Sequence, residues 1–253
     1  MVREVLITGA TGTLGRKLVG AATAAGHHVR AMSRRSHVGY TGVHWSQGDL
    51  LANTGVDAAV EGVDVVVHCA TQGTGDKDVT STENLITAAR RAGVAHIVYV
   101  SIVGIDRIPL PYYKTKLRVE RDLEASSVGH TVLRATQFHD LIKMSFSIQR
   151  FSPLLWTLKG VRFQPIDTRD VTSRLVELID CEPAGRVADI GGPAVQTHAE
   201  LARIYLAARG GRRPVFELPV PGRIVAGYRA GANLAPDNAV GTVGFEEYLA
   251  RTE

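Results

Sequence analysis

A tyrosine and a lysine lie four positions apart in this chain, at Tyr112 and Lys116. Pro111 before them favours the first turn of a helix, so both side chains are expected on one helix face. An ordinary tyrosine has a pKa of about 10, and a lysine ammonium beside the phenol favours the ionised form. The pair therefore predicts an acid or base for the oxygen of a hydride acceptor. Ser101, at the end of the preceding strand, is placed to hydrogen-bond the same oxygen.

The same spacing also has a purely structural interpretation. Tyrosine and lysine occur four residues apart by chance, and Lys116 could instead pair with Glu120 on a charged outer face, as Arg118 could with Asp122. Tyr113 competes with its neighbour for the chemical role if the helix begins one residue later. Spacing alone leaves these alternatives open.

A glycine-rich turn within residues 5–16, VLITGATGTLGR, predicts a phosphate site. Glycine permits positive φ there and lets main-chain amides approach a ligand closely. The helix that follows directs its unpaired N–H groups and positive dipole end toward an anion. Because the turn follows the first strand of a chain that continues in β/α alternation, we interpret it as a dinucleotide site rather than a plain glycine-rich turn. The predicted contacts are Gly9, Thr11, Gly12, Thr13, Leu14 and Gly15.

The end of the second strand indicates which dinucleotide is preferred. A NAD site places an acidic residue about 20 positions past the glycines, and here that zone reads MSRRS, without a carboxylate. The Arg34 guanidinium suits the 2′-phosphate of NADP(H), with Ser33 as a further donor and Arg35 beside it. One charged hydrogen bond contributes about 1.5 to 3 kcal/mol, enough for a roughly ten- to hundredfold preference for NADP(H) over NAD(H). Ordinary surface arginines are the alternative, with NAD(H) as the second cofactor considered.

The turns after later strands supply the remaining predicted cofactor contacts. Asp49, in the turn GDL after the third strand, is placed to accept a hydrogen bond from adenine N6, and it is equally a candidate turn or N-cap aspartate. Further contacts are expected at Leu50, Ala70, Thr71, Lys116 and Phe138.

Short β-rich runs alternate with helical periodicity along the first half of the chain. Apolar strands joined by helices imply a parallel sheet covered on both faces, in the doubly wound order 3-2-1-4-5-6. We expect a single α/β domain of the Rossmann type, with a dinucleotide-binding core at 1–137 and a smaller substrate-side lobe at 138–253 interleaved with it. Strands are expected at 2–8, 28–32, 43–47, 64–70, 96–101 and 130–135, helices at 14–25, 81–92 and 113–125, and further helix starts at DTRD, 167–170, and the capping-box sequence THAE, 197–200.

The segment 138–165 has few charges and four aromatic residues: Phe146, Phe151, Trp156 and Phe163. These residues fit the roof of an apolar pocket and equally fit ordinary core packing. His139, just past the sixth strand, is either a neutral group that polarises or deprotonates a substrate at the nicotinamide end of the pocket, or a packed core histidine.

Composition narrows the class of protein. The chain has 253 residues, 45% of them hydrophobic, and a net charge of +4. Its arginines are scattered rather than gathered on a basic helix, so we expect no nucleic-acid partner. The sequence contains no run of about 18 apolar residues and no signal-peptide pattern, which predicts a cytoplasmic protein without a membrane partner. Cys69 and Cys181 are expected to be reduced. The sequence has no metal-ligand spacing, so no metal site is expected. We expect a monomer or homodimer that acts on a small-molecule substrate.

Several motifs together resemble one known family. TGATGTLG, the SRR after the second strand, YVSIVGID, PYYKTK, LRATQFHD and DIGGPAVQTHAELA are similar to the NmrA-like group of atypical short-chain dehydrogenases/reductases, over nearly the whole chain. The resemblance implies an NAD(P)-binding Rossmann fold in which Tyr112 acts as acid/base and Lys116 anchors the nicotinamide ribose. A serine on the fifth strand assists in that superfamily. Here Ser101 lies eleven residues before Tyr112, closer than the usual separation.

These expectations combine into one predicted activity. A hydride passes between NADP(H) and a carbonyl or enone of an apolar, aromatic small molecule, with Tyr112 donating the proton and Phe138 and His139 bordering the substrate. Two alternatives stay open because the resemblance implies both. One is a redox-sensing regulator that binds the dinucleotide without turnover, and the other is a tailoring enzyme of aromatic polyketides of the oxygenase type.

Overall fold

The computed structural model describes residues 1–35, 42–73 and 75–251, so the last serine of MSRRS lies outside the described residues. The chain forms two compact units. The first unit contains Met1–Ser101, Pro111–Leu133 and Thr172–Val187. The second unit contains Ile102–Leu110, Arg134–Val171 and Ala188–Glu253.

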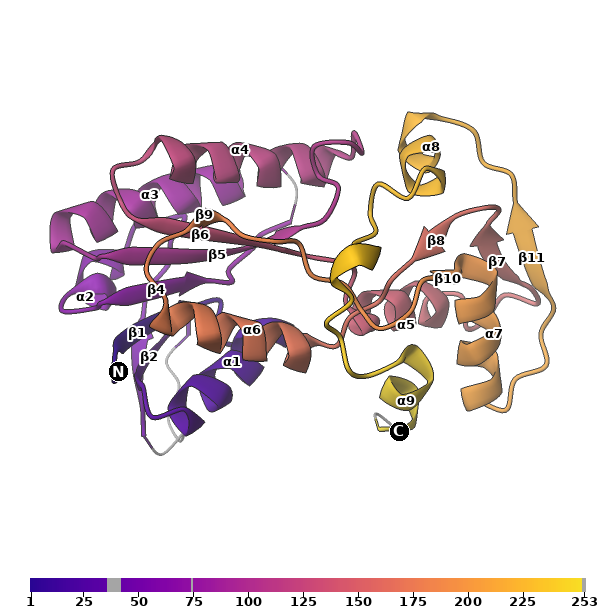
Figure 1. The fold of residues 1–253 in the computed structure, drawn as a ribbon, viewed down its shortest axis with the longest axis horizontal. Coiled ribbons are helices and arrows are strands. Elements are labelled where there is room, and N and C mark those ends of the chain that lie inside the picture. Colours follow the sequence, from indigo (N-terminus) through magenta and orange to yellow (C-terminus); the bar gives the residue numbers. More distant parts are fainter. Residues whose placement is uncertain (36–41, 74, 252–253) are drawn as a thin grey trace. The chain divides into compact units, whose positions relative to one another are not determined.

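A seven-stranded, mostly parallel sheet forms the centre of the first unit (Figure 1). Its order is β3-β2-β1-β4-β5-β6-β9, which confirms the six predicted strands and their doubly wound arrangement. The seventh strand pairs with β6 through two residues only, too few for a periodic pattern to reveal it. The strands are β1 (Glu4–Thr8), β2 (His28–Ser33), β3 (Val43–Gln47), β4 (Val65–His68), β5 (His96–Ile102), β6 (His130–Ala135) and β9 (Gly185–Arg186).

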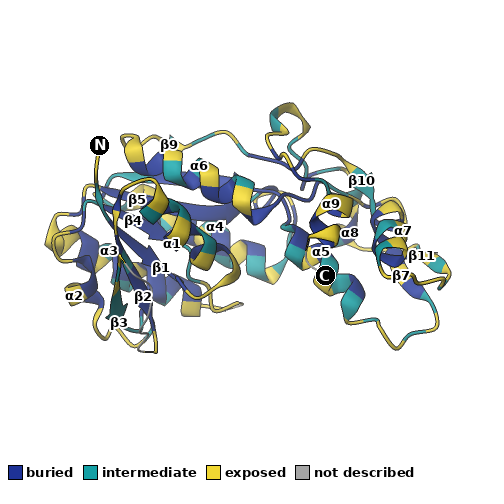
Figure 2. Cartoon of the chain, turned by 90° about the horizontal axis from the view of Figure 1, so that it is seen from below, coloured by how far each residue is buried: buried dark blue, intermediate teal, exposed yellow. Residues whose placement is uncertain are grey.

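Helices cover both faces of this sheet. In Figure 1, α3 and α4 lie over one face, and α1 and the first-unit part of α6 lie over the other. The central strands between them are buried, including every residue of β4, and β1 has the colour of buried residues along most of its length in Figure 2. No helix in the described ranges is both long and apolar enough to cross a membrane. These helices are α1 (Thr13–Ala24), α2 (Val56–Val60), α3 (Lys77–Ala92), α4 (Pro111–Ala125) and α6 (Thr168–Asp180).

The second unit has its own apolar core, built from α5, α7, α9 and the short strands beside them. β7 pairs in parallel with β11, and β8 pairs antiparallel with β10. The sequence did not predict these strands, whose lengths are two to four residues. The elements are α5 (His139–Ser147), β7 (Leu155–Leu158), β8 (Arg162–Phe163), β10 (Gln196–Thr197), α7 (His198–Ala208), β11 (Val215–Leu218), α8 (Arg223–Arg229), the 3-10 helix η1 (Pro236–Asn238) and α9 (Phe245–Ala250).

The four aromatic residues of 138–165 divide between two environments. Phe146 is fully buried, with its ring centroid 5.4 Å from that of Tyr205, and Phe163 packs against the same core. Phe151 is 86% exposed and Trp156 is 38% exposed. Core packing therefore accounts for two of the four.

Both predicted helix starts at DTRD and THAE are confirmed. The Thr197 hydroxyl accepts a hydrogen bond from the Glu200 amide at 3.1 Å, and the Glu200 carboxylate accepts one from the Thr197 amide at 2.7 Å, which completes the capping box. At the start of α6, Asp167 accepts from the Arg169 amide at 2.7 Å. Each side chain satisfies an amide that the helix itself leaves unpaired.

The turn between β1 and α1 depends on two glycines with no room for a side chain. Gly9 has a φ of +65°, and a Cβ on it would lie 2.7 Å from the backbone of Ala70. A Cβ on Gly15 would lie 2.2 Å from the carbonyl oxygen of Gly9. Gly12 has an ordinary φ of −74°, so positive φ is needed only at the first of the three glycines.

Gly15→Ala is expected to lower the free energy of unfolding by about 1–3 kcal/mol, because the new methyl group overlaps the Gly9 carbonyl. Urea unfolding followed by circular dichroism measures this change. Gly20→Ala in the same helix is the matched control, since nothing lies within 4 Å of a Cβ there. That control should raise stability by about 0.5–1 kcal/mol. Equal effects of the two substitutions would contradict the close packing of the turn.

Candidate functional site

A cavity of about 490 Å³ lies in the first unit, at the carboxyl ends of β1, β2 and β4. Its volume falls within the roughly 300–1,000 Å³ of small-molecule sites. Doubly wound sheets bind their ligands at this edge. The wall consists of Thr8, Gly9, Thr11, Gly12, Met32, Ser33, Arg34, Gly48, Asp49, Leu50, Cys69, Ala70, Thr71, Gln72, Asp78 and Ser81.

The N-terminus of α1 begins at this wall. Gly12 lines the cavity as the N-cap residue and offers no side chain to cap the helix. The first hydrogen bond of the helix joins the Arg16 amide to the Gly12 carbonyl at 3.1 Å. The amides of Thr13, Leu14 and Gly15 therefore have no acceptor within the helix. Free amides at the positive end of a helix dipole are the arrangement that a bound phosphate requires.

Residues after β2 and β3 form another part of the wall. Ser33 and Arg34 lie at the end of β2, and no carboxylate accompanies them there. Asp49 fulfils the turn role that the sequence offered as an alternative, since its Oδ1 accepts from the Leu51 amide at 2.8 Å. The same residue lies on the cavity wall. Arg35 is not among the wall residues, and its amide donates to the Ser33 hydroxyl at 3.2 Å.

The wall contains most of the predicted cofactor contacts: Gly9, Thr11, Gly12, Ser33, Arg34, Asp49, Leu50, Ala70 and Thr71. Thr13, Leu14, Gly15, Arg35 and Lys116 are not wall residues, and Phe138 belongs to the second unit. Sequence reasoning missed Thr8, Met32, Gly48, Cys69, Gln72, Asp78 and Ser81. Five of these directly adjoin predicted contacts. The other two, Asp78 and Ser81, lie one turn apart on α3, which begins four residues before its predicted start.

One buried hydroxyl on the wall has no protein partner. Ser81 is 4% exposed, and its hydroxyl makes no hydrogen bond within the described residues. An unsatisfied buried polar group costs about 1–3 kcal/mol, and a polar ligand in the cavity would reduce that cost. This orphan hydroxyl, the uncapped α1, the close approach at Gly9 and the cation at Arg34 all fit a dinucleotide phosphate and its sugars.

Lys116 is buried in the first unit with few partners. Its Nζ donates to the Val100 carbonyl at 3.4 Å and lies 4.7 Å from the centroid of the Tyr99 ring. Burial lowers the pKa of Lys116, and the charge of Asp78 opposes that change. Lys116 forms no ion pair within the part of the chain that is described. Its ammonium therefore keeps N–H donors for an acceptor such as a ribose hydroxyl.

Tyr112 lies one turn before Lys116 on α4, which begins at Pro111, two residues before the predicted start at 113. Its hydroxyl is 3.3 Å from Oγ1 of the wall residue Thr71, and its ring centroid is 6.0 Å from the lysine Nζ. Burial raises the pKa of Tyr112, the hydrogen bond with Thr71 opposes the increase, and the charge of Asp78 adds to it. The expectation that the lysine would favour tyrosinate is therefore wrong for this structure. Desolvation and a nearby carboxylate outweigh an ammonium at that distance.

The structure also describes the residues that the sequence offered as alternatives around α4. Tyr113 is buried, 5% exposed, and the helix does not start at the later position that would have made it the candidate. Arg118 pairs with Asp76 at 3.5 Å and with Glu83 at 3.7 Å, across to α3, rather than with Asp122. Ser101 is 3% exposed, and its hydroxyl has no hydrogen-bond partner among the residues described, Tyr112 included.

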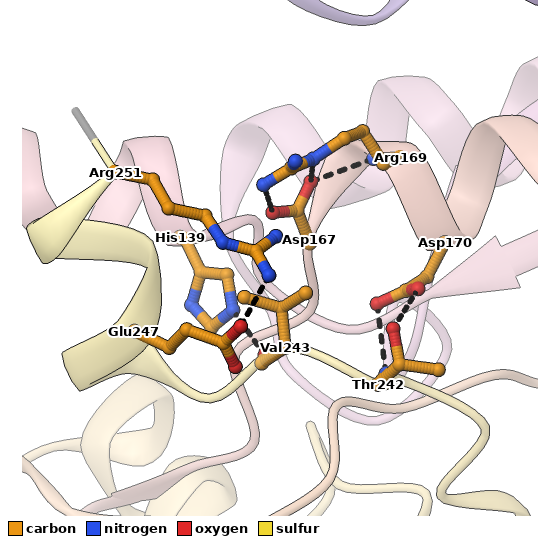
Figure 3. Close-up of polar contacts among 8 residues, drawn as sticks. All are labelled: His139, Asp167, Arg169, Asp170, Thr242, Val243, Glu247 and Arg251. Atoms are coloured by element: carbon orange, nitrogen blue, oxygen red, sulfur yellow. Dashed lines mark hydrogen bonds and ion pairs between the residues drawn. The ribbon is translucent and has the colours of Figure 1, made fainter.

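His139 lies in the second unit and holds the C-terminal segment of that unit. It is 1% exposed, and its Nε2 donates to the Val243 carbonyl at 2.9 Å (Figure 3). Its ring stacks on Phe245 and Tyr248, with centroid distances of 5.7 and 4.9 Å. Burial lowers the pKa of His139. These contacts match the packed core histidine, the second of the two roles considered.

Comparison with known sequences gives a consistent pattern. A family model described as NAD(P)H-binding matches residues 9–151, more than half of the chain. The photosystem II assembly factor Ycf39 of Trieres chinensis is 24% identical over 251 residues, which cover 92% of this chain and 79% of that protein. A (4-alkanoyl-5-oxo-2,5-dihydrofuran-3-yl)methyl phosphate reductase of Streptomyces griseus is 28% identical over 211 residues, 79% of this chain and 73% of that one. The chloroplastic divinyl chlorophyllide a 8-vinyl-reductase of Zea mays is 29% identical over 221 residues, and the chain covers 55% of its length.

Comparison with solved structures concerns the fold. The NADPH-dependent quinone oxidoreductase QOR2 of Escherichia coli, complexed with NADPH, matches with a TM-score of 0.85 at 19% identity, covering 98% of this chain and 99% of that one. A nucleoside-diphosphate-sugar epimerase of Staphylococcus aureus matches with a TM-score of 0.78 at 20% identity, covering 97% and 99%. The predicted NAD(P)-binding Rossmann fold is confirmed.

The pH dependence of the free energy of unfolding can test how His68 is packed behind the cavity. It is 2% exposed and lies between two hydroxyls, 2.7 Å from Thr8 Oγ1 and 3.1 Å from Thr82 Oγ1. Burial, with the charge of Lys116, lowers the pKa of His68 to about 3. The folded protein therefore holds this ring neutral.

Because the folded-state pKa of His68 lies below the unfolded value of about 6.5, its contribution to stability is present above pH 6.5 and is lost as the pH falls toward 3. Between pH 7 and pH 5 the loss due to this residue is about 2 kcal/mol. Urea unfolding at the two pH values should show a loss that is smaller by this amount in His68→Gln than in the wild type. An identical loss in both proteins would show that His68 is not held neutral.

Proposed function

The chain belongs to the NAD(P)H-binding family, and from that premise we propose that it is an NADP(H)-dependent oxidoreductase of the atypical short-chain dehydrogenase/reductase type. Its reaction is hydride transfer to or from a carbonyl or enone of an apolar, aromatic small molecule. The observation that carries the proposal is a cavity in the first unit that has Arg34 on its wall and the uncapped α1 beside it, and whose wall residue Thr71 is hydrogen-bonded to Tyr112. The reductases among the relatives support it.

The preference for NADP(H) rests on charge at the end of β2. Arg34 offers a planar donor pair to a 2′-phosphate, Ser33 adds a hydroxyl, and no acidic side chain competes there. The pyrophosphate would take the free amides of α1, and Asp49 would lie toward the adenine. Lys116 would donate to the nicotinamide ribose.

When bound, a reduced nicotinamide supplies the hydride. Tyr112 holds the proton that a carbonyl oxygen gains in the reduced product. Its raised pKa keeps the phenol protonated at neutral pH, which suits a proton donor and hence the reductive direction. Lys116 orients the sugar and leaves the proton on Tyr112. The aromatic substrate class follows from the family resemblance, with Phe138 as its proposed neighbour, while His139 is given no catalytic role.

A second candidate function is dinucleotide binding without turnover, in a regulatory or assembly protein. The observation that favours it is the name of one relative, an assembly factor that is similar over 92% of this chain. It differs from the first candidate in one measurable respect. NADPH would bind, yet no carbonyl, enone or quinone would oxidise it.

Arg34→Ala is expected to weaken NADPH binding by roughly ten- to hundredfold and to leave NADH binding unchanged, because only the 2′-phosphate loses its partner. Isothermal titration calorimetry with both nucleotides measures the two affinities. Arg90→Ala removes an exposed arginine in the last turn of α3 and serves as the matched control. A wild type that binds neither nucleotide would overturn the proposed function, and an equal loss for both nucleotides would remove only the cofactor preference.

Tyr112→Phe is expected to lower kcat for NADPH oxidation by roughly 10²- to 10⁴-fold, because the phenol proton is lost while the ring is kept. The assay follows NADPH absorbance with an aromatic aldehyde, an aryl enone and a quinone as acceptors. Tyr113→Phe should retain activity near that of the wild type. The reverse pattern would assign the proton to Tyr113, and a wild type inert toward every acceptor would favour the second candidate.

A further inference from the structure

Asp78 is a buried carboxylate on the cavity wall that the sequence did not single out. It lies in the first turn of α3 and is 5% exposed. Its Oδ2 accepts a hydrogen bond from the Thr71 hydroxyl at 2.7 Å, and its Oδ1 accepts one from the Gln72 amide. Within the described residues it has no ion pair with a lysine or arginine. Its hydrogen bonds are thus directed toward the segment that follows β4.

These contacts fix the direction of a short proton chain. An ionised carboxylate only accepts hydrogen bonds, and a threonine hydroxyl has a single proton. The Thr71 proton is committed to Asp78, so toward Tyr112 the same hydroxyl oxygen can only accept. The Tyr112 hydroxyl, 3.3 Å away, is then the donor. The phenol proton consequently points at the Thr71 oxygen.

We propose that Asp78 is a positioning residue for Tyr112: through the Thr71 hydroxyl it directs the phenol proton and keeps it on the tyrosine, which makes Tyr112 a proton donor. The catalytic consequence rests on the proposed function. The proton chain itself is a property of the first unit and does not depend on a bound nucleotide.

The groups that face Tyr112 do not all shift its pKa in the same direction. Burial raises the pKa of Tyr112, and Asp78 from α3 and Tyr113 from α4 add to it. Tyr99 on β5 is a second buried phenol, and its own pKa is raised by burial and by Tyr112. Lys116 is the opposing charge, with its Nζ 6.0 Å from the Tyr112 ring centroid. The hydrogen bond with Thr71 acts the other way and lowers the pKa of Tyr112. Its full effect requires that Thr71 donate to the phenolate, and Asp78 competes for that proton by accepting it at 2.7 Å.

Asp78→Asn is expected to reverse the direction of the hydrogen bonds that join residue 78, Thr71 and Tyr112. The side chain keeps nearly the same shape. The asparagine oxygen would accept from the Gln72 amide, which leaves the side-chain NH₂ to donate to Thr71. The Thr71 proton is then released and can be donated to the Tyr112 oxygen. Hydrogen bonding to the ionised form favours that form, so the substitution should make the phenol more acidic.

The test is a pH titration of Tyr112 in the full chain without nucleotide, followed by tyrosinate ultraviolet absorbance. Subtracting the same titration of Tyr112→Phe in each background isolates this phenol. Asp78→Asn is expected to lower the pKa of Tyr112 by about one pH unit, a tenfold change in its ionisation constant. Asp76→Asn, an exposed acid two residues earlier, should leave it unchanged. A Tyr112 pKa that is unchanged or higher in Asp78→Asn would overturn the proposal.

Two variants at Thr71 keep the test decisive if Asp78→Asn does not fold. Thr71→Ser retains the hydroxyl and should keep the wild-type titration. Thr71→Val removes the hydroxyl that joins Asp78 to Tyr112 and should lower the pKa of Tyr112. Identical titrations of these two variants would also overturn the proposal. Because the measurement uses the nucleotide-free protein, failure here is distinct from failure of the proposed function, which calorimetry with NADPH reports.

Discussion

The close approach of two backbone segments at the β1–α1 turn is the constraint on which the site depends. Gly9 lies so near Ala70 that a Cβ cannot fit, and a Cβ on Gly15 would lie even closer to the Gly9 carbonyl. This packing sets the first turn of α1 directly against the ends of β1 and β4. Since Gly12 offers no capping side chain, the amides of that turn remain for a ligand. A side chain at either glycine would move the helix and remove the anion site together.

Near this turn the first unit buries polar groups, and their desolvation costs free energy. The Lys116 ammonium makes one long hydrogen bond and lies over the Tyr99 ring. The Ser81 hydroxyl has no hydrogen-bond partner within the described residues. A purely structural core would replace both with apolar side chains. A ligand that supplies sugar hydroxyls and phosphate oxygens would satisfy these donors. The same features that lower the stability of the free protein therefore favour binding.

The sequence predicted the parts of the structure that local rules control. The apolar runs predicted six strands in the correct order, Pro111 indicated the first turn of α4, and Thr197 with Glu200 predicted a capping box. What it missed depends on contacts between distant segments. The two-residue strand β9 exists only because β6 offers it a partner. The pKa of Tyr112 was predicted in the wrong direction because spacing on one helix reveals Lys116 but not the burial and the α3 carboxylate that oppose it.

The carboxylate of Asp78 is better explained by a functional role than by a structural one. A position in the first turn of α3 gains about 0.3–1 kcal/mol from the helix dipole when it is acidic. Burial of an ionised group outside an ion pair costs more than this, and a neutral asparagine would fill the same space at lower cost. Two hydrogen bonds reduce the cost, yet one of them comes from the hydroxyl that contacts Tyr112. Asparagine can replace the acceptor for the Gln72 amide, but it cannot also accept from Thr71 in that orientation. The negative charge is therefore best explained by what it imposes on the proton of Tyr112.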